Sequence, residues 1–198
     1  MLPAIMGEPI ENHGIVGDLR TTALVAMDGT VDFLCWPRFD SPSIFASLLD
    51  EERGGCFELA PLLDGVRRRQ LYIPDTNVLL TRFLSPQGVA EISDFMAIGG
   101  AHPQQLVRRV KAIRNAIPLR MRCAPRFDYA RAACTVRTEA GTIVFTAAGN
   151  HGTALRHRRK LAEHWRTDHI NRAAKSGAEH QQRELQAGAI DVRKRYQD

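Results

Sequence analysis

The 198-residue sequence contains no apolar run near the roughly 20 residues that a membrane-spanning helix requires. Its first residues, MLPAIMGEPIENHG, place no basic segment ahead of an apolar one, which argues against a secretory signal peptide. The four cysteines form no C-x-x-C pair, and each lies in apolar or strand-like sequence, so we expect reduced thiols in a core. These absences predict a cytoplasmic protein that does not associate with a membrane.

The spacings of the common cofactor and metal sites are absent as well. Residues 14–18, GIVGD, are not followed by Lys-Ser or Lys-Thr and are not a phosphate loop. Five of the seven histidines lie after residue 150, but no two are spaced i, i+4 on one helix face and no cysteine accompanies them. His13, Asp18 and Arg20 form a polar N-terminal group without a nucleophile or second carboxylate at a defined distance. We therefore expect no metal and no cofactor, and the sequence assigns no catalytic residue.

Charge is distributed unevenly around the formal net charge of +5. Residues 1–150 contain 16 Lys and Arg against 16 Asp and Glu, whereas residues 151–198 contain 11 against 6. The change predicts a domain over residues 1–150 and a basic tail over residues 151–198. The tail is rich in good helix formers but has too few apolar residues for a continuous buried stripe, so we expect it to be helical or disordered.

The basic tail raises the question of nucleic acid or another anionic partner, bound by release of counterions. Acidic residues are mixed in throughout, and only Trp165 and Tyr196 offer stacking surfaces. The run at 156–160 is a single basic cluster rather than an extended one. A solvated basic segment is the better interpretation, and nucleic acid is not the expected partner.

Residues 1–150 have the pattern of a β-protein. Alternating apolar and polar residues, bounded by Gly, Pro, Asn and Asp, predict short strands at 22–27, 30–36, 56–60, 66–73, 77–84, 89–96, 105–113, 118–123, 134–138 and 142–147. Turn residues at 28–29, 85–88 and 139–141 predict three hairpins. Short strands at close spacing predict an all-β fold, an antiparallel β-sandwich.

A single helix is expected, directly after the first hairpin. Ser41-Pro42 supplies an N-cap and a first-turn proline. Ile44, Phe45, Leu48 and Leu49 follow at helical spacing, which predicts a helix of about two turns.

The residues between that hairpin and helix form the most site-like cluster of the sequence. The indole of Trp36 can stack on a pyranose ring, while Arg38 and Asp40 can donate to and accept from sugar hydroxyls. In the alternative interpretation, an Arg38–Asp40 pair orders the connection and Trp36 and Phe39 lie in the core. Buried aromatic residues usually serve packing, which favours this second interpretation. Pro-Arg-Phe-Asp recurs at residues 125–128, and we expect the two loops to solve the same structural problem rather than to line one groove.

Residues 10–149 resemble the N-terminal domains of glycoside hydrolase family 15. The segments that carry the resemblance are IENHGIVGDLRTTALVAMDGTVDFLCWPRFDSPSIFASLLD, LYIPDTNVLLTRF, ISDFM, LVRRV and PRFDYAR. The resemblance implies a β-sandwich that packs beside an (α/α)-barrel catalytic domain in the same chain. Members are glucoamylases, glucodextranases and trehalases, which hydrolyse α-glucosidic bonds with inversion through two carboxylic acids on the barrel. It also implies an α-glucan or trehalose as the sugar.

The tail departs from this pattern, because further sandwich strands and the barrel would be expected in its place. We hypothesise that residues from about 156 onward are out-of-frame or otherwise divergent coding, which the nucleotide sequence would test. The favoured function is a non-catalytic N-terminal domain of an α-glucosidic-bond hydrolase, inactive alone. The alternatives are a free-standing carbohydrate-binding module and an anion- or nucleic-acid-binding protein that acts through the tail.

Overall fold

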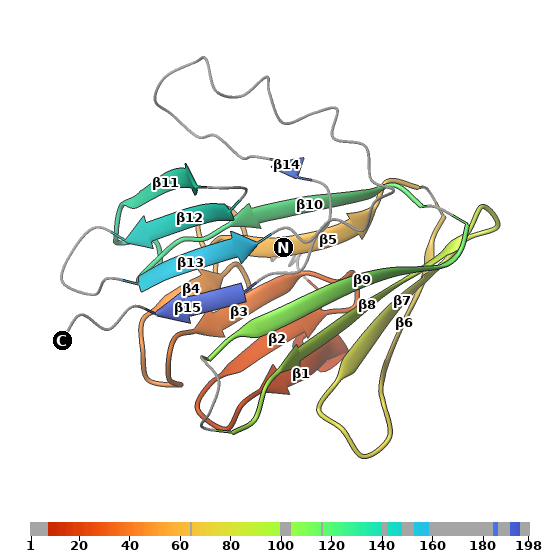
Figure 1. The fold of residues 1–198 in the computed structure, drawn as a ribbon, viewed down its shortest axis with the longest axis horizontal. Helices are drawn as coiled ribbons and strands as arrows, with labels where there is room; N and C mark the ends of the chain where they lie inside the picture. The colour runs from red at the N-terminus through yellow and green to blue at the C-terminus, as the bar shows by residue number, and fades with distance from the viewer. Residues whose placement is uncertain are drawn as a thin grey trace, which may run out of the picture.

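The computed structural model describes residues 8–63, 65–99, 104–115, 117–139, 142–147, 153–158, 184–185 and 191–194. Within these residues the chain forms antiparallel strands and one three-residue 3-10 helix, η1 (Ile10–Asn12). The strands make three sheets, so the prediction of an all-β antiparallel sandwich is confirmed (Figure 1).

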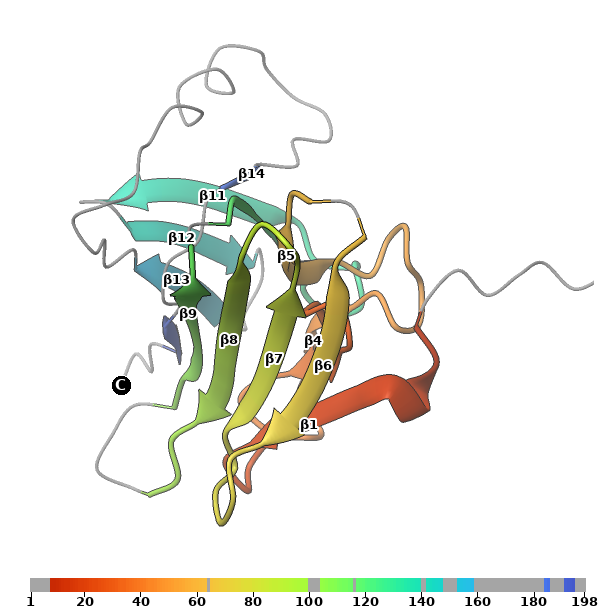
Figure 2. The same ribbon diagram turned by 90° about the vertical axis from the view of Figure 1, so that its right-hand side faces the viewer.

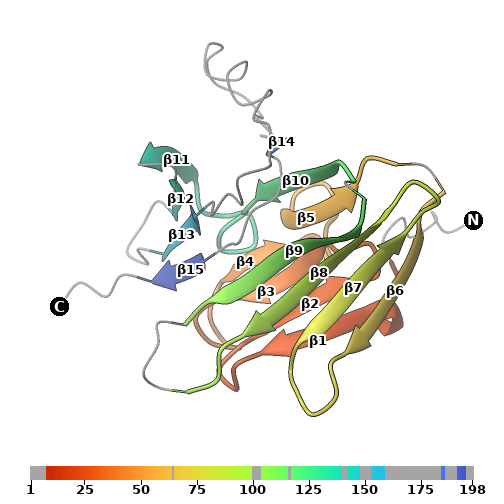
Figure 3. The same ribbon diagram turned by 45° about the vertical axis from the view of Figure 1, so that its right-hand side comes forward.

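The first sheet has seven strands in the order β1-β2-β3-β5-β10-β14, and β4 pairs with β3 beside this path. Its strands are β1 (His13–Gly17), β2 (Thr22–Ala26), β3 (Val31–Cys35), β4 (Ser43–Ala46), β5 (Cys56–Pro61), β10 (Leu119–Ala124) and β14 (Glu184–Leu185). The second sheet is a meander of β6 (Arg67–Tyr72), β7 (Leu79–Leu84), β8 (Val89–Met96) and β9 (Leu106–Arg114). It lies across β1–β3 and forms the facing layer (Figure 3).

The third sheet follows the order β11-β12-β13-β15 and extends the layer that faces the first sheet. Its strands are β11 (Cys134–Glu139), β12 (Thr142–Ala147), β13 (Thr153–Arg158) and β15 (Asp191–Lys194). β15 lies beside β9, the last strand of the second sheet (Figure 2). Phe57 of the first sheet, Phe83 of the second and Phe145 of the third belong to one buried cluster, so all three sheets share the core.

A buried arginine, held by an ion pair within the second sheet, joins the two main layers inside this core. Arg108 on β9 and Asp94 on β8 are both fully buried, and Arg108 donates to the two Asp94 carboxylate oxygens at 2.8 and 3.1 Å. Arg108 also donates across the sandwich to the backbone oxygens of Phe57 and Gly29, and its guanidinium lies 4.5 Å from the centre of the Phe57 ring. One side chain of the second sheet thereby binds β5 and the β2–β3 turn of the first.

The three predicted hairpins are present. β2 pairs with β3, β7 with β8 and β11 with β12, each antiparallel. In the first hairpin, Gly29 has the positive φ of 86° that glycine adopts readily, and Asp28 accepts a hydrogen bond from the Thr30 nitrogen at 2.8 Å. A register shift between Leu24 and Val25 makes this hairpin irregular, which the two-residue Asp28-Gly29 turn did not predict.

The prediction of a helix after the first hairpin is wrong. Residues 43–46 form β4, which pairs antiparallel with β3 and is buried along its whole length. Ile44 and Phe45 are β-branched and aromatic, so a strand buried on both faces suits them better than a helix. A turn follows at once, with the nitrogens of Leu49 and Asp50 both donating to the Ala46 oxygen, and Leu49 is exposed. The spacing that indicated a helix face therefore came from a buried strand followed by a turn.

The tail also differs from its prediction where it is described. Residues 153–158, 184–185 and 191–194 are strands β13, β14 and β15, so the helical alternative is wrong for them. β14 pairs with β10 of the first sheet, and β13 and β15 complete the third sheet. The other tail residues lie outside the described residues.

Tyr72 protects the exposed edge of the first sheet. Its hydroxyl accepts a hydrogen bond from the Ile15 nitrogen at 2.7 Å and donates to the Ile15 oxygen at 2.9 Å, on edge strand β1. We expect Tyr72→Phe to lower the free energy of unfolding by about 0.5–1.5 kcal/mol, because water can solvate the exposed backbone groups that lose their partner. Urea unfolding measures the change. Tyr129→Phe is the control, since its hydroxyl lies near the weakly bonding Cys35 thiol, and an equal loss there would contradict the prediction.

Candidate functional site

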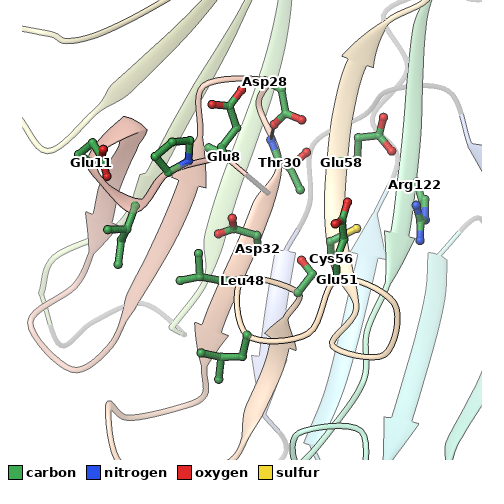
Figure 4. A pocket seen from close by; sticks show the side chains of 15 residues that line it. Glu8, Glu11, Asp28, Thr30, Asp32, Leu48, Glu51, Cys56, Glu58 and Arg122 are labelled. Carbon is green, nitrogen blue, oxygen red and sulfur yellow. Dashed lines mark hydrogen bonds between the residues drawn. The ribbon is translucent and has the colours of Figure 1, made fainter. Parts of the chain in front are cut away.

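The structure has a cleft of about 1070 Å³ on the outer side of the first sheet. Cys56 and Glu58 on β5 and Arg122 on β10 face it, because they alternate with Phe57, Leu59 and Met121, which face the core. The remaining lining comes from residues 8–11 before β1, from residues 26–32 of the first hairpin and from residues 47–51 after β4. Segments distant in sequence therefore meet here (Figure 4).

Acidic side chains dominate the cleft. Six carboxylates line it, those of Glu8, Glu11, Asp28, Asp32, Glu51 and Glu58, and Arg122 is the one lysine or arginine among the lining residues. Figure 4 shows Asp28, Asp32 and Glu58 among these side chains, and Asp32 is the buried one of the three. Glu58 also accepts from the Arg120 guanidinium at 2.6 Å. Such a surface attracts cations and can accept hydrogen bonds from hydroxyl groups.

Asp32, which lines the cleft, forms a tight pair with His13. His13 Nε2 lies 2.6 Å from Asp32 Oδ2, while His13 Nδ1 faces the backbone oxygens of Pro9 and Ile10 at 3.0 and 3.2 Å. Because carbonyl oxygens only accept, Nδ1 carries a proton, and a second proton must lie between Nε2 and the carboxyl group. The other Asp32 oxygen, Oδ1, is buried and has no hydrogen-bond partner.

Both members of this pair have raised pKa values. Burial is the main cause that raises the pKa of Asp32 above 3.8, and the hydrogen bond and charge of His13 oppose it in part. For His13, burial lowers the pKa, but the hydrogen bond and charge of Asp32, with the Pro9 and Ile10 carbonyls, outweigh burial and raise it above 6.5. The pair therefore retains its shared proton at higher pH than either isolated group would.

The stability that this pair contributes should fall as pH rises. A raised folded-state pKa means that the folded protein binds more protons than the unfolded chain. The stability that His13 contributes is therefore complete below pH 6.5, the pKa of an unfolded histidine, and is lost as pH rises through the higher pKa of the folded state. We expect the stability difference between wild type and His13→Gln to shrink between about pH 6 and 9, where histidine loses its proton. Urea unfolding across that range measures it. A difference that stays constant or grows would contradict the prediction.

The structure separates the three residues that the sequence singled out for sugar binding. Trp36 is fully buried in the core, whereas Arg38 and Asp40 are exposed and bind each other at 3.0 Å from Nε to Oδ1. This hydrogen bond lowers the pKa of the Asp40 carboxyl. The core position expected for Phe39 in the alternative interpretation is wrong, because its side chain is 61% exposed. Sugar binding by this loop stays a prediction.

The second Pro-Arg-Phe-Asp segment lies close to the first but has a different role. The Arg126 and Asp128 nitrogens donate to the Ile44 and Ser43 oxygens, so the segment lies along β4, immediately after the first loop. Phe127 is 3% exposed, in contrast to Phe39. The two loops therefore do not solve the same structural problem.

The four cysteines are free thiols, and three of them are buried, as expected for core residues. Within the described ranges, no group of three or more His, Cys, Asp or Glu side chains is arranged to hold a metal ion. No helix in the described part of the chain is long and apolar enough to cross a membrane. Four of the five tail histidines lie outside the described residues.

The comparisons with known proteins agree with one another. The family of trehalase-like N-terminal domains matches residues 4–183. Trehalase 1 of Sulfolobus acidocaldarius is 41% identical over 116 residues, which are 59% of this chain and 19% of that protein. Trehalases of Mycolicibacterium smegmatis and Thermoplasma volcanium are each 32% identical, over 64% and 69% of this chain and 22% and 23% of their own length. No solved structure matches.

The chain spans about a fifth of the length of these curated relatives. The family match also runs past residue 150 into the basic tail, where β13 was found. Because the match covers most of the chain, the chain belongs to the family of trehalase-like N-terminal domains.

Proposed function

We propose that this chain is the non-catalytic N-terminal domain of a trehalase-like hydrolase of glycoside hydrolase family 15, and that it works joined to a catalytic domain. The observation that carries the proposal is the match to an N-terminal family, together with relatives named trehalase that are about five times longer than the matched region. Trehalose, or a related α-glucan, is then the substrate of the whole enzyme.

The chemistry of the cleft supports a non-catalytic role. Inverting glycosidases need a general acid whose proton reaches the glycosidic oxygen and a base that activates water. Asp32 has the raised pKa that a general acid needs, but its Oδ2 is bonded to His13 and its Oδ1 is buried. Its proton therefore cannot reach a sugar in the cleft, which supports the proposal that the two catalytic carboxyl groups belong to the catalytic domain.

The sandwich contributes rigidity and surface rather than proton transfer. Its layers are joined by the hydrogen bonds of buried Arg108 to Phe57 and Gly29, so it can offer a fixed surface to a neighbouring domain. The free thiols agree with a reducing compartment, and we place the protein in the cytoplasm.

The proposal is tested by mixing this chain with the part of Sulfolobus acidocaldarius Trehalase 1 that follows its matched 116 residues. We expect the chain alone to release no glucose from trehalose, and the catalytic part to bind the chain and gain activity or thermal stability. Glucose release by the chain alone, or no binding between the two parts, would contradict the proposal. Titration of the chain alone with trehalose and maltooligosaccharides tests the carbohydrate-binding alternative.

A further inference from the structure

We infer that two loops at one end of the sandwich, residues 18–21 and 36–42, form the surface that docks on the catalytic domain. We name them the docking loops. This inference rests on the proposed function and adds to it the position and chemistry of the interface. The loops follow β1 and β3 and project from the lower left end of the molecule in Figure 1.

The docking loops are held rigidly before any partner binds. The Phe39 nitrogen donates to the Arg20 oxygen at 2.9 Å, which joins one loop to the other. The Asp18 carboxylate accepts from the Arg20 and Thr21 nitrogens at 3.0 Å each, and Thr21 Oγ1 donates to the Cys35 oxygen at 2.5 Å. A loop that is already ordered loses little conformational entropy on binding, so its contacts contribute more fully to affinity.

Further hydrogen bonds fix the second docking loop, residues 36–42, at its two ends and along its length. The Trp36 nitrogen donates to the Pro42 oxygen at 3.3 Å, and the Trp36 side chain lies in the core below. From outside the loop, Gln104 Nε2 donates to the Pro37 oxygen at 2.7 Å. The loop conformation is therefore determined by the body of the domain rather than by the exposed side chains that it carries.

Those exposed side chains are the ones expected at an interface. Phe39 is 61% exposed and stands between Arg38 and Asp40 in the sequence. The same tetrapeptide at residues 125–128 buries its phenylalanine, so the motif itself does not force the ring outward. Aromatic residues, phenylalanine included, and arginine are enriched at protein interfaces relative to the rest of the surface.

Leu19 provides a second apolar contact at a conformational cost. It is 82% exposed and has φ of 71°, in the left-handed region that branched and bulky residues rarely adopt. Glycine or asparagine would fit this position with less strain, and an exposed leucine gains nothing from packing within the domain. A leucine in a strained, solvent-exposed position is explained if the ring of Phe39 and the side chain of Leu19 enter the same apolar surface of a partner.

The partner surface follows from this chemistry. It should be an apolar pocket of the catalytic domain that receives Phe39 and Leu19, with a carboxylate and a basic group at its rim opposite Arg38 and Asp40. The acidic cleft is the competing surface, and it also carries an exposed apolar side chain, Leu49, which is 67% exposed. Leu49 therefore serves as a matched control for Phe39.

The test measures binding of this chain to the catalytic part of Trehalase 1 by calorimetry, with wild type, Phe39→Ser, Leu19→Gly and Leu49→Ser. We expect Phe39→Ser to raise Kd roughly 30-fold and Leu49→Ser to leave it unchanged. Leu19→Gly should weaken binding without lowering the thermal midpoint of the isolated chain, a result that a merely structural role would not give.

The outcomes separate this inference from the proposed function. If the wild type binds and neither Phe39→Ser nor Leu19→Gly weakens binding, the inference about the docking loops is overturned and the proposed function stands. If Leu49→Ser alone weakens binding, the interface lies at the acidic cleft and the inference about the docking loops is again overturned. No binding by wild type overturns both proposals.

Discussion

Replacing Arg108 by methionine is expected to lower the free energy of unfolding by about 3–5 kcal/mol, because it leaves Asp94 charged and buried without a partner. The loss includes more than one ion pair, since the Phe57 and Gly29 carbonyls on the opposite sheet also lose their donor. Methionine fills much of the same volume, so a cavity contributes little. Urea unfolding at neutral pH measures the change.

The neighbouring residue on the same strand provides the control. Arg109 is exposed, and Arg109→Met should change the free energy of unfolding by less than about 0.5 kcal/mol. The double variant Arg108→Met with Asp94→Leu should recover part of the lost stability, because it removes the unpaired charge. Equal effects of Arg108→Met and Arg109→Met would show that Arg108 does not join the layers.

The sequence predicted the elements whose signals are local. The 85–88 turn and the strands beside it were recognised because alternation and turn residues lie within a few positions of one another. Arg108 could not be recognised in this way. Its partners Phe57 and Gly29 lie 51 and 79 residues away, and in the sequence it is one arginine in an ordinary strand. The hydrogen bonds by which Arg108 joins the layers therefore depend on a topology that periodicity does not contain.

The candidate site shows the same limit. The 36–42 loop was found because its aromatic, charged and proline residues are consecutive, but sequence could not decide which side chains point outward. Trp36 is buried and Phe39 is exposed, although both are large aromatic residues of the same loop. The acidic cleft was missed because its carboxylates come from four separate segments. The one usable signal was the polar residue at position 32 within a strand of apolar residues, which marks the buried Asp32.

Gly54→Ala is expected to lower the free energy of unfolding by about 1–3 kcal/mol, near the upper end of that range. A β-carbon at this position would fall on the Ala46 carbonyl group and lie 2.5 Å from the Ser47 nitrogen. These are backbone atoms at the end of β4, so they cannot move aside as a flexible side chain would. Gly54 also donates to the Asp50 oxygen and accepts from the Ala46 nitrogen, which fixes its position against β4.

The clash therefore acts on the strand where sequence predicted a helix. If residues 43–49 formed that helix, the close approach of Gly54 to Ala46 would not exist and alanine would be tolerated at position 54. Thermal and urea unfolding of Gly54→Ala, compared with Arg53→Ala at the exposed neighbouring position, distinguish the two structures. We expect Arg53→Ala to stay within about 0.5 kcal/mol of wild type. A Gly54→Ala variant as stable as wild type would mean that β4 does not pack against this turn.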